Sequence, residues 1–256
     1  MLIDSHCHLQ ALTLDERETV LDDARAAGVS GFLVPATKLE DWEDVLAICH
    51  RHADVWCALG VHPHEAASWT DSHASRLRAL LADPKALAVG ECGLDFHYDF
   101  ATPEAQVRAL RAQWAIAIEL GLPVVVHNRE SDEEMLRQVR DPAHEALRAD
   151  FHSFAGARAM AAELVARGFY FGFSGMLTFK KADNIRELLA QVPPDRALVE
   201  TDTPYLAPAP HRGKPNQPAW VRLVAERMAA EREESLEAVA ERTSRNFRTL
   251  FWKAAG

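Results

Sequence analysis

Leu120-Gly121-Leu122-Pro123-Val124-Val125-Val126-His127 joins the end of a helical pattern to a short apolar run. The pattern predicts a helix over 103–120, because Thr102 can cap it, Pro103 suits its first position and Gly121 can end it. The run from Pro123 to His127 is apolar almost throughout, as expected of a strand in a sheet that helices cover. The stretch therefore predicts a helix followed by a buried parallel strand.

The same alternation runs along the whole chain. Four further helices are predicted over 14–27, 157–167, 218–232 and 236–251. Eight strand-like runs are predicted at Leu2 to His8, Gly31 to Ala36, Val55 to Val61, Ala86 to Glu91, Pro123 to His127, Asp150 to Phe154, Phe169 to Phe173 and Ala197 to Asp202. Strands that alternate with helices form parallel βαβ units. We expect an α/β fold, with a single (β/α)8 TIM-barrel domain over residues 1–256.

An open, doubly wound sheet is the alternative arrangement of such units. It would place a glycine-rich turn after the first strand to bind a dinucleotide, but Ser5-His6-Cys7-His8 stands there instead. The chain has no low-complexity segment that would mark a domain boundary. The proline-rich stretch from Thr203 to Pro218 follows the last predicted strand and indicates one long loop, which favours a functional role for it.

Composition limits the classes of function. Lys and Arg number 28 against 38 Asp and Glu, so the net charge is −10 and a protein that coats nucleic acid non-specifically is excluded. The first residues lack the basic and apolar regions of a signal peptide, and no apolar run is long enough to span a bilayer. Four cysteines without a CxxC motif favour reduced thiols. We expect a cytoplasmic protein that neither enters a membrane nor holds a stable protein partner.

His6 and His8 are two residues apart in a predicted strand. Alternation would put both imidazoles on one face and Cys7 on the other. Two imidazoles that converge on a point are what a divalent cation needs from its ligands. Alone, the pair is equally compatible with two hydrogen-bonded histidines.

The ends of other predicted strands also carry metal-binding side chains. The carboxyl ends of all barrel strands open on one face, where the active site of a TIM barrel lies. The full set of predicted ligands is His6, His8, Glu91, His127, His152 and Asp202. Six ligands exceed what one tetrahedral ion takes, so we expect two divalent ions that share a carboxylate. Mixed nitrogen and oxygen ligands suit Zn, Mn, Co, Ni or Fe and tolerate Mg.

Three further residues are candidates for binding substrate. His62 follows the third predicted strand, Arg129 lies two residues past His127, and Arg212 lies in the long last loop. The planar guanidinium of arginine suits phosphate or carboxylate recognition.

Taken together, these motifs resemble the TatD family of metal-dependent hydrolases, often described as deoxyribonucleases. The resemblance covers essentially the whole chain. It is carried by the segments Ile3 to Leu9, Gly60 to His64, Gly90 to Asp95, Leu122 to Arg129, His152 to Gly156, Glu200 to Leu206, His211 to Asn216, Asn246-Phe247 and Leu250-Phe251.

The resemblance implies a TIM barrel of the amidohydrolase type and an assignment of the ligands. His6, His8 and Asp202 would hold one ion, His127 and His152 the other, and Glu91 would bridge them. Many members have His-Cys-Phe-Ser-Gly where this chain has His152-Ser153-Phe154-Ala155-Gly156, and Ala is common where Ser131 stands. These departures touch no predicted ligand but bear on the substrate.

The function that the resemblance implies is phosphodiester hydrolysis of DNA. Cleavage of RNA and attack from a 3′ end are compatible with it. We expect a metal-bound hydroxide to attack phosphorus, with Asp202 as the general base and a residue such as Arg129 stabilising the developing charge. The same metal core would serve ester or amide hydrolysis, including aminoacyl-tRNA deacylation. A non-catalytic metal-binding protein is a third alternative, which the complete ligand set disfavours.

Overall fold

The computed structural model describes residues 1–252 and divides into two compact units. The first unit comprises Met1–Val34 and His152–Thr249, and the second comprises Pro35–Phe151 and the end of the chain from Leu250. None of the helices within residues 1–252 combines the length and apolar character that crossing a membrane requires.

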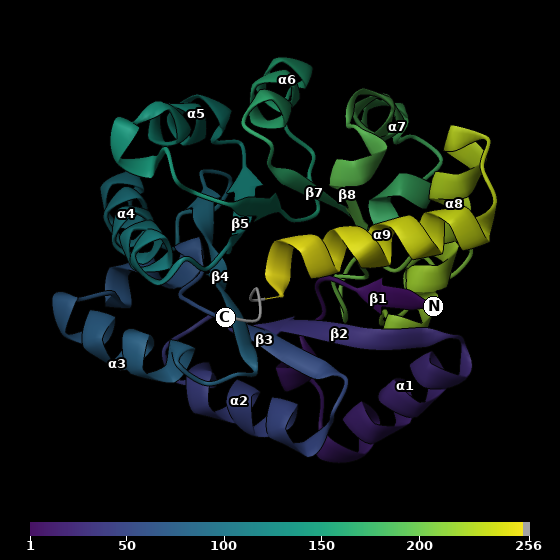
Figure 1. The fold of residues 1–256 in the computed structure, drawn as a ribbon, viewed down its shortest axis with the longest axis horizontal. Coiled ribbons are helices and arrows are strands. Elements are labelled where there is room, and N and C mark those ends of the chain that lie inside the picture. Colours follow the sequence, from purple (N-terminus) through teal and green to yellow (C-terminus); the bar gives the residue numbers. More distant parts are fainter. Residues whose placement is uncertain (253–256) are drawn as a thin grey trace. The chain divides into compact units, whose positions relative to one another are not determined.

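The second unit is built around four neighbouring parallel strands (Figure 1). They are β3 (Val55–Leu59), β4 (Ala86–Asp95), β5 (Val124–Arg129) and β6 (Ala149–Phe151). Its helices are α2 (Asp41–Arg51), α3 (Asp71–Leu81), α4 (Pro103–Leu120) and α5 (Asp132–Arg140), with 3-10 turns at Pro63–Ser68 and Pro142–His144. Strand and helix alternate throughout, which is the βαβ pattern that the sequence predicts.

The first unit carries the other four strands. They are β1 (Leu2–Asp4), β2 (Val29–Pro35), β7 (Tyr170–Phe173) and β8 (Ala197–Val199), with β1 parallel to β2 and β7 parallel to β8. Its helices are α1 (Leu14–Ala26), α6 (Arg158–Ala166), α7 (Asp183–Gln191), α8 (Val221–Arg232) and α9 (Leu236–Phe251). Four 3-10 turns complete it, at Leu9–Ala11, Gly175–Thr178, Pro194–Arg196 and Pro218–Trp220.

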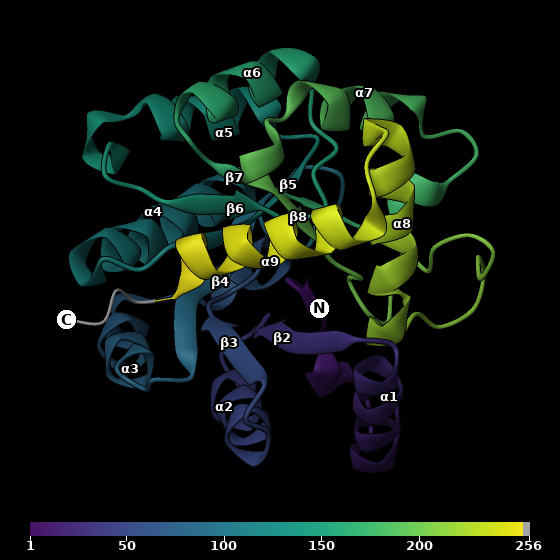
Figure 2. The ribbon, with the colours of Figure 1, turned by 45° about the vertical axis from the view of Figure 1, so that its right-hand side comes forward.

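The last helix ties the strands of the first unit together. Figure 2 shows α9 lying across β8. The side-chain amide of Asn246 on α9 donates to the carbonyls of Ala197 at 2.8 Å and Pro194 at 2.9 Å. Ser244 Oγ, two residues earlier, donates to the carbonyl of Met1 at 2.9 Å. The C-terminal helix therefore satisfies backbone acceptors at the start of β8 and before β1.

Several predicted strand boundaries are wrong. The strand β1 ends at Asp4, so His6 and His8 lie in the segment after it rather than inside it. Glu91 does not end β4, which continues for four residues to Asp95. The strand β8 ends at Val199, three residues before Asp202. Helices 103–120 and 236–251 have the predicted bounds, and the 218–232 helix begins as a 3-10 turn.

Two buried glutamines on α4 hold the ends of neighbouring strands. The amide of Gln106 accepts from Asp95 N at 2.8 Å and donates to Asp95 O at 2.9 Å and Ala101 O at 3.0 Å. Gln113 makes the same pair of bonds to the backbone of Val61, at 2.7 and 3.1 Å. Backbone groups at strand ends lose their sheet partners, and these side chains replace them.

Truncation of Gln106, one of the two glutamines that bind strand ends, should destabilise the protein. Gln106→Ala leaves the buried N–H and carbonyl of Asp95 without these partners, at a cost of about 1–3 kcal/mol in the free energy of unfolding. Urea unfolding followed by circular dichroism measures it. Arg108→Ala, at an exposed position of the same helix, is the matched control and should change stability by less than about 0.5 kcal/mol. Equal stabilities of the two variants would contradict the stabilising role of the Gln106 hydrogen bonds.

Candidate metal centre

Two loops of the first unit run side by side and bring histidines against an aspartate. Cys7 and Thr203 form an isolated parallel bridge, and Asp202 N donates to His6 O at 2.8 Å. The Nε2 atoms of His6 and His8 lie 3.2 Å apart. Asp202 Oδ1 lies 3.7 Å from His6 Nε2 and 3.3 Å from His8 Nε2. The expected convergence of the two imidazoles is therefore present, although they follow β1.

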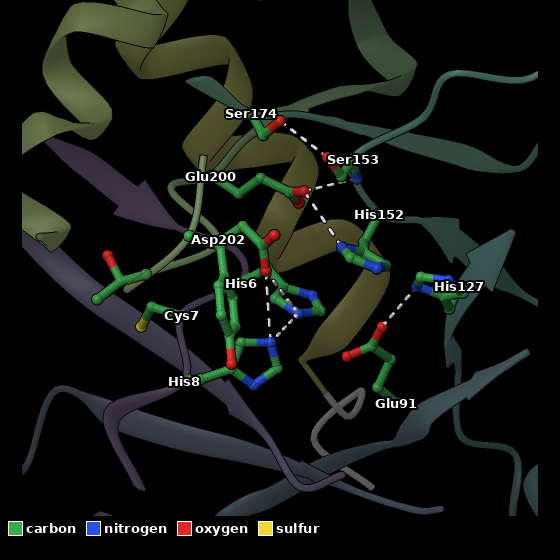
Figure 3. A network of polar contacts seen from close by, with 12 residues as sticks. His6, Cys7, His8, Glu91, His127, His152, Ser153, Ser174, Glu200 and Asp202 are labelled. Atoms are coloured by element: carbon green, nitrogen blue, oxygen red, sulfur yellow. Dashed lines mark hydrogen bonds and ion pairs between the residues drawn. The ribbon is translucent and has the colours of Figure 1, made fainter. Parts of the chain in front are cut away.

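His152 joins this group from the loop after β6. Its ring stacks on that of His6, with centroids 3.9 Å apart and planes 15° from parallel. One ligand atom each from His6, His152 and Asp202 lies within 4.8 Å of the other two (Figure 3). Two imidazoles and a carboxylate from three separate segments thus form one group of potential ligands, called here the first cluster together with His8.

The backbone is in an uncommon conformation at two places in the first cluster. Asp202 has φ 60° and Ser153, next to His152, has φ 43°. Positive φ is rare for residues other than glycine and gathers at functional sites. Asp is among the side chains that tolerate it best. The chain therefore adopts a locally unfavourable turn where it presents Asp202.

The buried carboxylate of Glu200 supports His152 from behind. Glu200 Oε1 accepts from Ser153 N at 2.6 Å and lies 3.5 Å from His152 Nδ1 (Figure 3). Ser5 Oγ donates to the other oxygen at 3.4 Å. A carboxylate on one ring nitrogen orients an imidazole and leaves the opposite nitrogen for a ligand. Glu200 is thus a positioning residue that the sequence analysis missed.

Gly172 on β7 makes room for this carboxylate. A Cβ at position 172 would lie 2.0 Å from Glu200 Oε2, far inside van der Waals contact. Only glycine allows Glu200 to lie over the strand in this way.

A second buried carboxylate holds the segment that carries His6. Asp4 accepts from Thr201 Oγ1 at 2.6 Å, from Thr201 N at 2.9 Å and from His6 N at 3.3 Å. Burial raises the pKa of Asp4 to about 8, against the lowering effect of these bonds. Asp4 therefore ties the loop after β1 to the loop after β8.

The second unit also contains a group of imidazoles around a carboxylate. His127 Nδ1 lies 3.1 Å and His62 Nε2 3.5 Å from Glu91 Oε1. One ligand atom each of these three residues lies within 4.8 Å of the others. Figure 3 shows the Glu91–His127 contact. His62, expected to contact substrate, thus lies beside two predicted ligands, and the three are called here the second cluster.

Asp95 supports the second cluster as Glu200 supports the first. Its Oδ2 lies 3.0 Å from both His127 Nε2 and His64 Nε2. Burial opposes ionisation of Asp95, but contacts with His127 and His64 outweigh it and hold its pKa well below the usual range. Nε2 of His127 is engaged, so Nδ1 is the nitrogen turned toward Glu91. Asp95 is the second positioning residue that sequence analysis missed.

The donor atoms of both clusters fit divalent cations. Each cluster offers imidazole nitrogens and a carboxylate oxygen, the ligand mixture of zinc and its first-row neighbours. Burial opposes ionisation of Asp202, but His8, His6 and His152 outweigh it and lower its pKa, so the carboxylate is charged at neutral pH. Among cysteines, Cys92 is buried and its Sγ contacts Val125 O, away from these ligands.

The two predicted arginines are both exposed. The Arg129 guanidinium lies 4.9 Å from the Tyr98 ring centroid, and that of Arg212 lies 3.5 Å from the Phe179 centroid. Each is therefore held over an aromatic face and accessible to solvent.

Removal of the Glu200 charge should weaken metal binding. Glu200→Gln keeps the size of the side chain but lowers the basicity of His152, so the affinity for Zn²⁺ or Mn²⁺ should fall about 10–100-fold. Titration of the apoprotein against a chromophoric chelator measures this. Glu187→Gln, at an exposed position of α7, should bind as the wild type does. Unchanged affinity in a stably folded Glu200→Gln variant would refute the positioning role.

Comparison with known proteins supports these observations. A family model described as TatD related DNase matches residues 3–252. The uncharacterized metal-dependent hydrolase YabD of Bacillus subtilis is 34% identical over 98% of this chain and 99% of its own length. The 3'-5' ssDNA/RNA exonuclease TatD of Cronobacter sakazakii is 39% identical, over 94% and 93% of the two chains.

A solved structure has the same fold. The crystal structure of YJJV, a TatD homolog from Escherichia coli K12, superposes with a TM-score of 0.91 at 30% identity, over 99% of this chain and 98% of that one. The predicted (β/α)8 TIM-barrel fold class is therefore confirmed. With a family match over nearly its whole length and ligand groups of the expected composition, the chain belongs to the TatD-related DNase family of metal-dependent hydrolases.

Proposed function

We propose that this hydrolase cleaves phosphodiester bonds of single-stranded DNA or RNA, working from the 3′ end. The observation that carries the proposal is the pair of His–carboxylate clusters, one in each unit. Relatives that share more than a third of their residues with this chain bear the name 3'-5' ssDNA/RNA exonuclease. A nuclease of this kind needs divalent cations to offset the charge of phosphate.

We further propose that the clusters serve one dinuclear centre within a single domain over residues 1–256. In a TIM barrel the carboxyl ends of all strands open on one face, which would bring ligands from both units together. His6, His8 and Asp202 would hold one ion, His127 and His152 the other, and Glu91 would bridge them. Two divalent ions per chain, drawn from Mg, Mn, Zn, Ni, Co and Fe, suit this donor set.

The ions would supply positive charge that lowers the pKa of an attacking water and stabilises the phosphorane-like transition state. The residues of the chain would manage the protons and the substrate. Asp202, ionised and beside His6 and His8, would accept the proton of the attacking water. The new P–O bond forms as the bond to the departing 3′ oxygen breaks, and that oxygen takes up a proton from solvent.

Three side chains are proposed to bind substrate. Arg129 and Arg212 would contact backbone phosphates with their exposed guanidinium groups. His62 lies 3.5 Å from Glu91 and would meet the phosphate being cleaved. The four buried cysteine thiols suit a reducing compartment, so we propose that the protein acts in the cytoplasm.

A substrate comparison tests the proposed function. The protein loaded with Mn²⁺, Mg²⁺ or Zn²⁺ should shorten a 5′-labelled single-stranded oligonucleotide stepwise and leave a blunt duplex intact, because the end of a blunt duplex exposes no unpaired terminal nucleotide. It should not cleave the ester bond of aminoacyl-tRNA. Gel electrophoresis follows the products, and excess chelator should abolish them. Chelator-sensitive deacylation of aminoacyl-tRNA without oligonucleotide shortening would favour the ester-hydrolase alternative. No turnover on either would favour a metal-binding protein.

Loss of the Asp202 carboxylate should strongly lower the rate of phosphodiester cleavage. Asp202→Asn retains the shape of the side chain but cannot accept the proton, so kcat should fall about 10²–10⁴-fold. Single-turnover oligonucleotide cleavage measures the rate, and elemental analysis measures the metal content of the same samples. Asp195→Asn, exposed in the first unit, should retain full activity. Full activity together with full metal content in Asp202→Asn would rule out Asp202 as the general base.

A further inference from the structure

The loop between β4 and α4 exposes two aromatic rings. Tyr98 is 42% and Phe100 65% exposed, and their ring centroids lie 5.6 Å apart. Rings of this size are normally buried, because each exposed apolar surface costs free energy in water. Both rings keep a large exposed fraction despite the side chains that contact them, so the pair forms an accessible aromatic surface, called here the Tyr98–Phe100 platform.

The platform is connected to the second cluster through His64. The His64 ring centroid lies 5.4 Å from that of Tyr98 and 4.7 Å from that of Phe100. His64 Nε2 contacts Asp95 Oδ2, which also contacts His127. Two side chains, His64 and Asp95, thus link the exposed rings to the proposed metal ligand His127.

The loop that carries the rings is held in place. Asp95 Oδ1 accepts from His97 N at 3.0 Å and from Tyr98 N at 3.2 Å. At the far side of the loop, Gln106 donates to Ala101 O. Rings on a loop with fixed ends lose less conformational freedom when they bind a ligand. The platform is therefore preorganised.

A cation accompanies the rings. The Arg129 guanidinium lies over the Tyr98 ring, and within residues 1–252 no carboxylate makes an ion pair with it. Neighbouring Glu130 contacts His97 Nδ1 at 2.7 Å. Exposed aromatic faces beside an arginine are the combination by which proteins bind unpaired bases and the phosphates that link them. Bases paired in a duplex cannot offer their faces in this way.

We propose that Tyr98 and Phe100 stack on unpaired bases near the cleaved end of a single-stranded nucleic acid, while Arg129 contacts the adjoining phosphate. The inference rests on the proposed nuclease function and adds a base-binding subsite to it. Stacking is tolerant of sequence, because every base has a π face. The platform would therefore select single strands over duplexes without selecting a base.

Binding of matched oligonucleotides tests the platform. Fluorescence anisotropy gives the Kd of a nuclease-resistant phosphorothioate oligothymidylate and of the same strand with abasic residues at its last three 3′ positions. The wild type should bind the base-bearing strand at least about 5-fold more tightly, since stacking contributes roughly 1–3 kcal/mol per base. In Tyr98→Ala and Phe100→Ala this preference should largely disappear, and Tyr98→Trp should restore it.

Two controls separate the possible failures. Trp252→Ala removes another exposed aromatic ring and should keep the wild-type preference, and circular dichroism checks that each variant is folded. If the wild type cleaves the normal oligonucleotide but the variants keep the full preference for bases, the platform is refuted and the nuclease function stands. If the wild type neither cleaves nor prefers the base-bearing strand, both proposals fail. Base-independent binding by the wild type would point to a protein partner for these rings and also refute the platform.

Discussion

A buried carboxylate behind an imidazole is the interaction on which both clusters depend. Glu200 contacts His152 in one unit, and Asp95 contacts His127 in the other. An imidazole has two nitrogens, and only one can face a cation. The carboxylate decides which one by engaging the other, and it also raises the basicity of the ring. Without these contacts the histidines could rotate, and the ligand atoms would not stay within reach of one another.

The two buried carboxylates need hydrogen bonds and space, which other parts of the fold supply. A carboxylate removed from water must receive hydrogen bonds, or it becomes protonated. Glu200 receives them from Ser153 N and Ser5 Oγ, and Asp95 from the backbone of residues 97 and 98. Space is needed as well. Gly172 leaves room for Glu200, and a Cβ at Gly93 would lie 1.9 Å from His127 O. Gly172 and the loop amides therefore serve the two carboxylates, whereas Gly93 allows the close approach of the His127 backbone.

The sequence predicts the fold class and most of the residues that form the two clusters, but it does not predict the side chains that support them. Apolar runs identify strands well, yet the run that predicts β4 stops at Glu91, whereas the strand continues to Asp95. Alternation of Glu91, Gly93 and Asp95 on one face was the available signal. Glu200 lies in a segment that carries the family resemblance, but the pattern does not indicate its contact with His152, and the space it occupies depends on Gly172, far away in the chain. Large aromatic side chains are usually buried for much of their surface, so the sequence pattern does not predict that Tyr98 and Phe100 are exposed.

An acidic chain that acts on a polyanion has to confine its attraction to one place. With a net charge of −10, long-range electrostatics repel nucleic acid, so non-specific binding along the surface is disfavoured. Affinity then has to come from short-range contacts: bound divalent ions that reverse the local sign, arginines held over aromatic rings, and ring faces that stack on bases. Stacking depends little on charge and needs bases that are not paired. The repulsive surface and the exposed rings thus favour the same substrate, a free single-stranded end that reaches the clusters without lying along the protein.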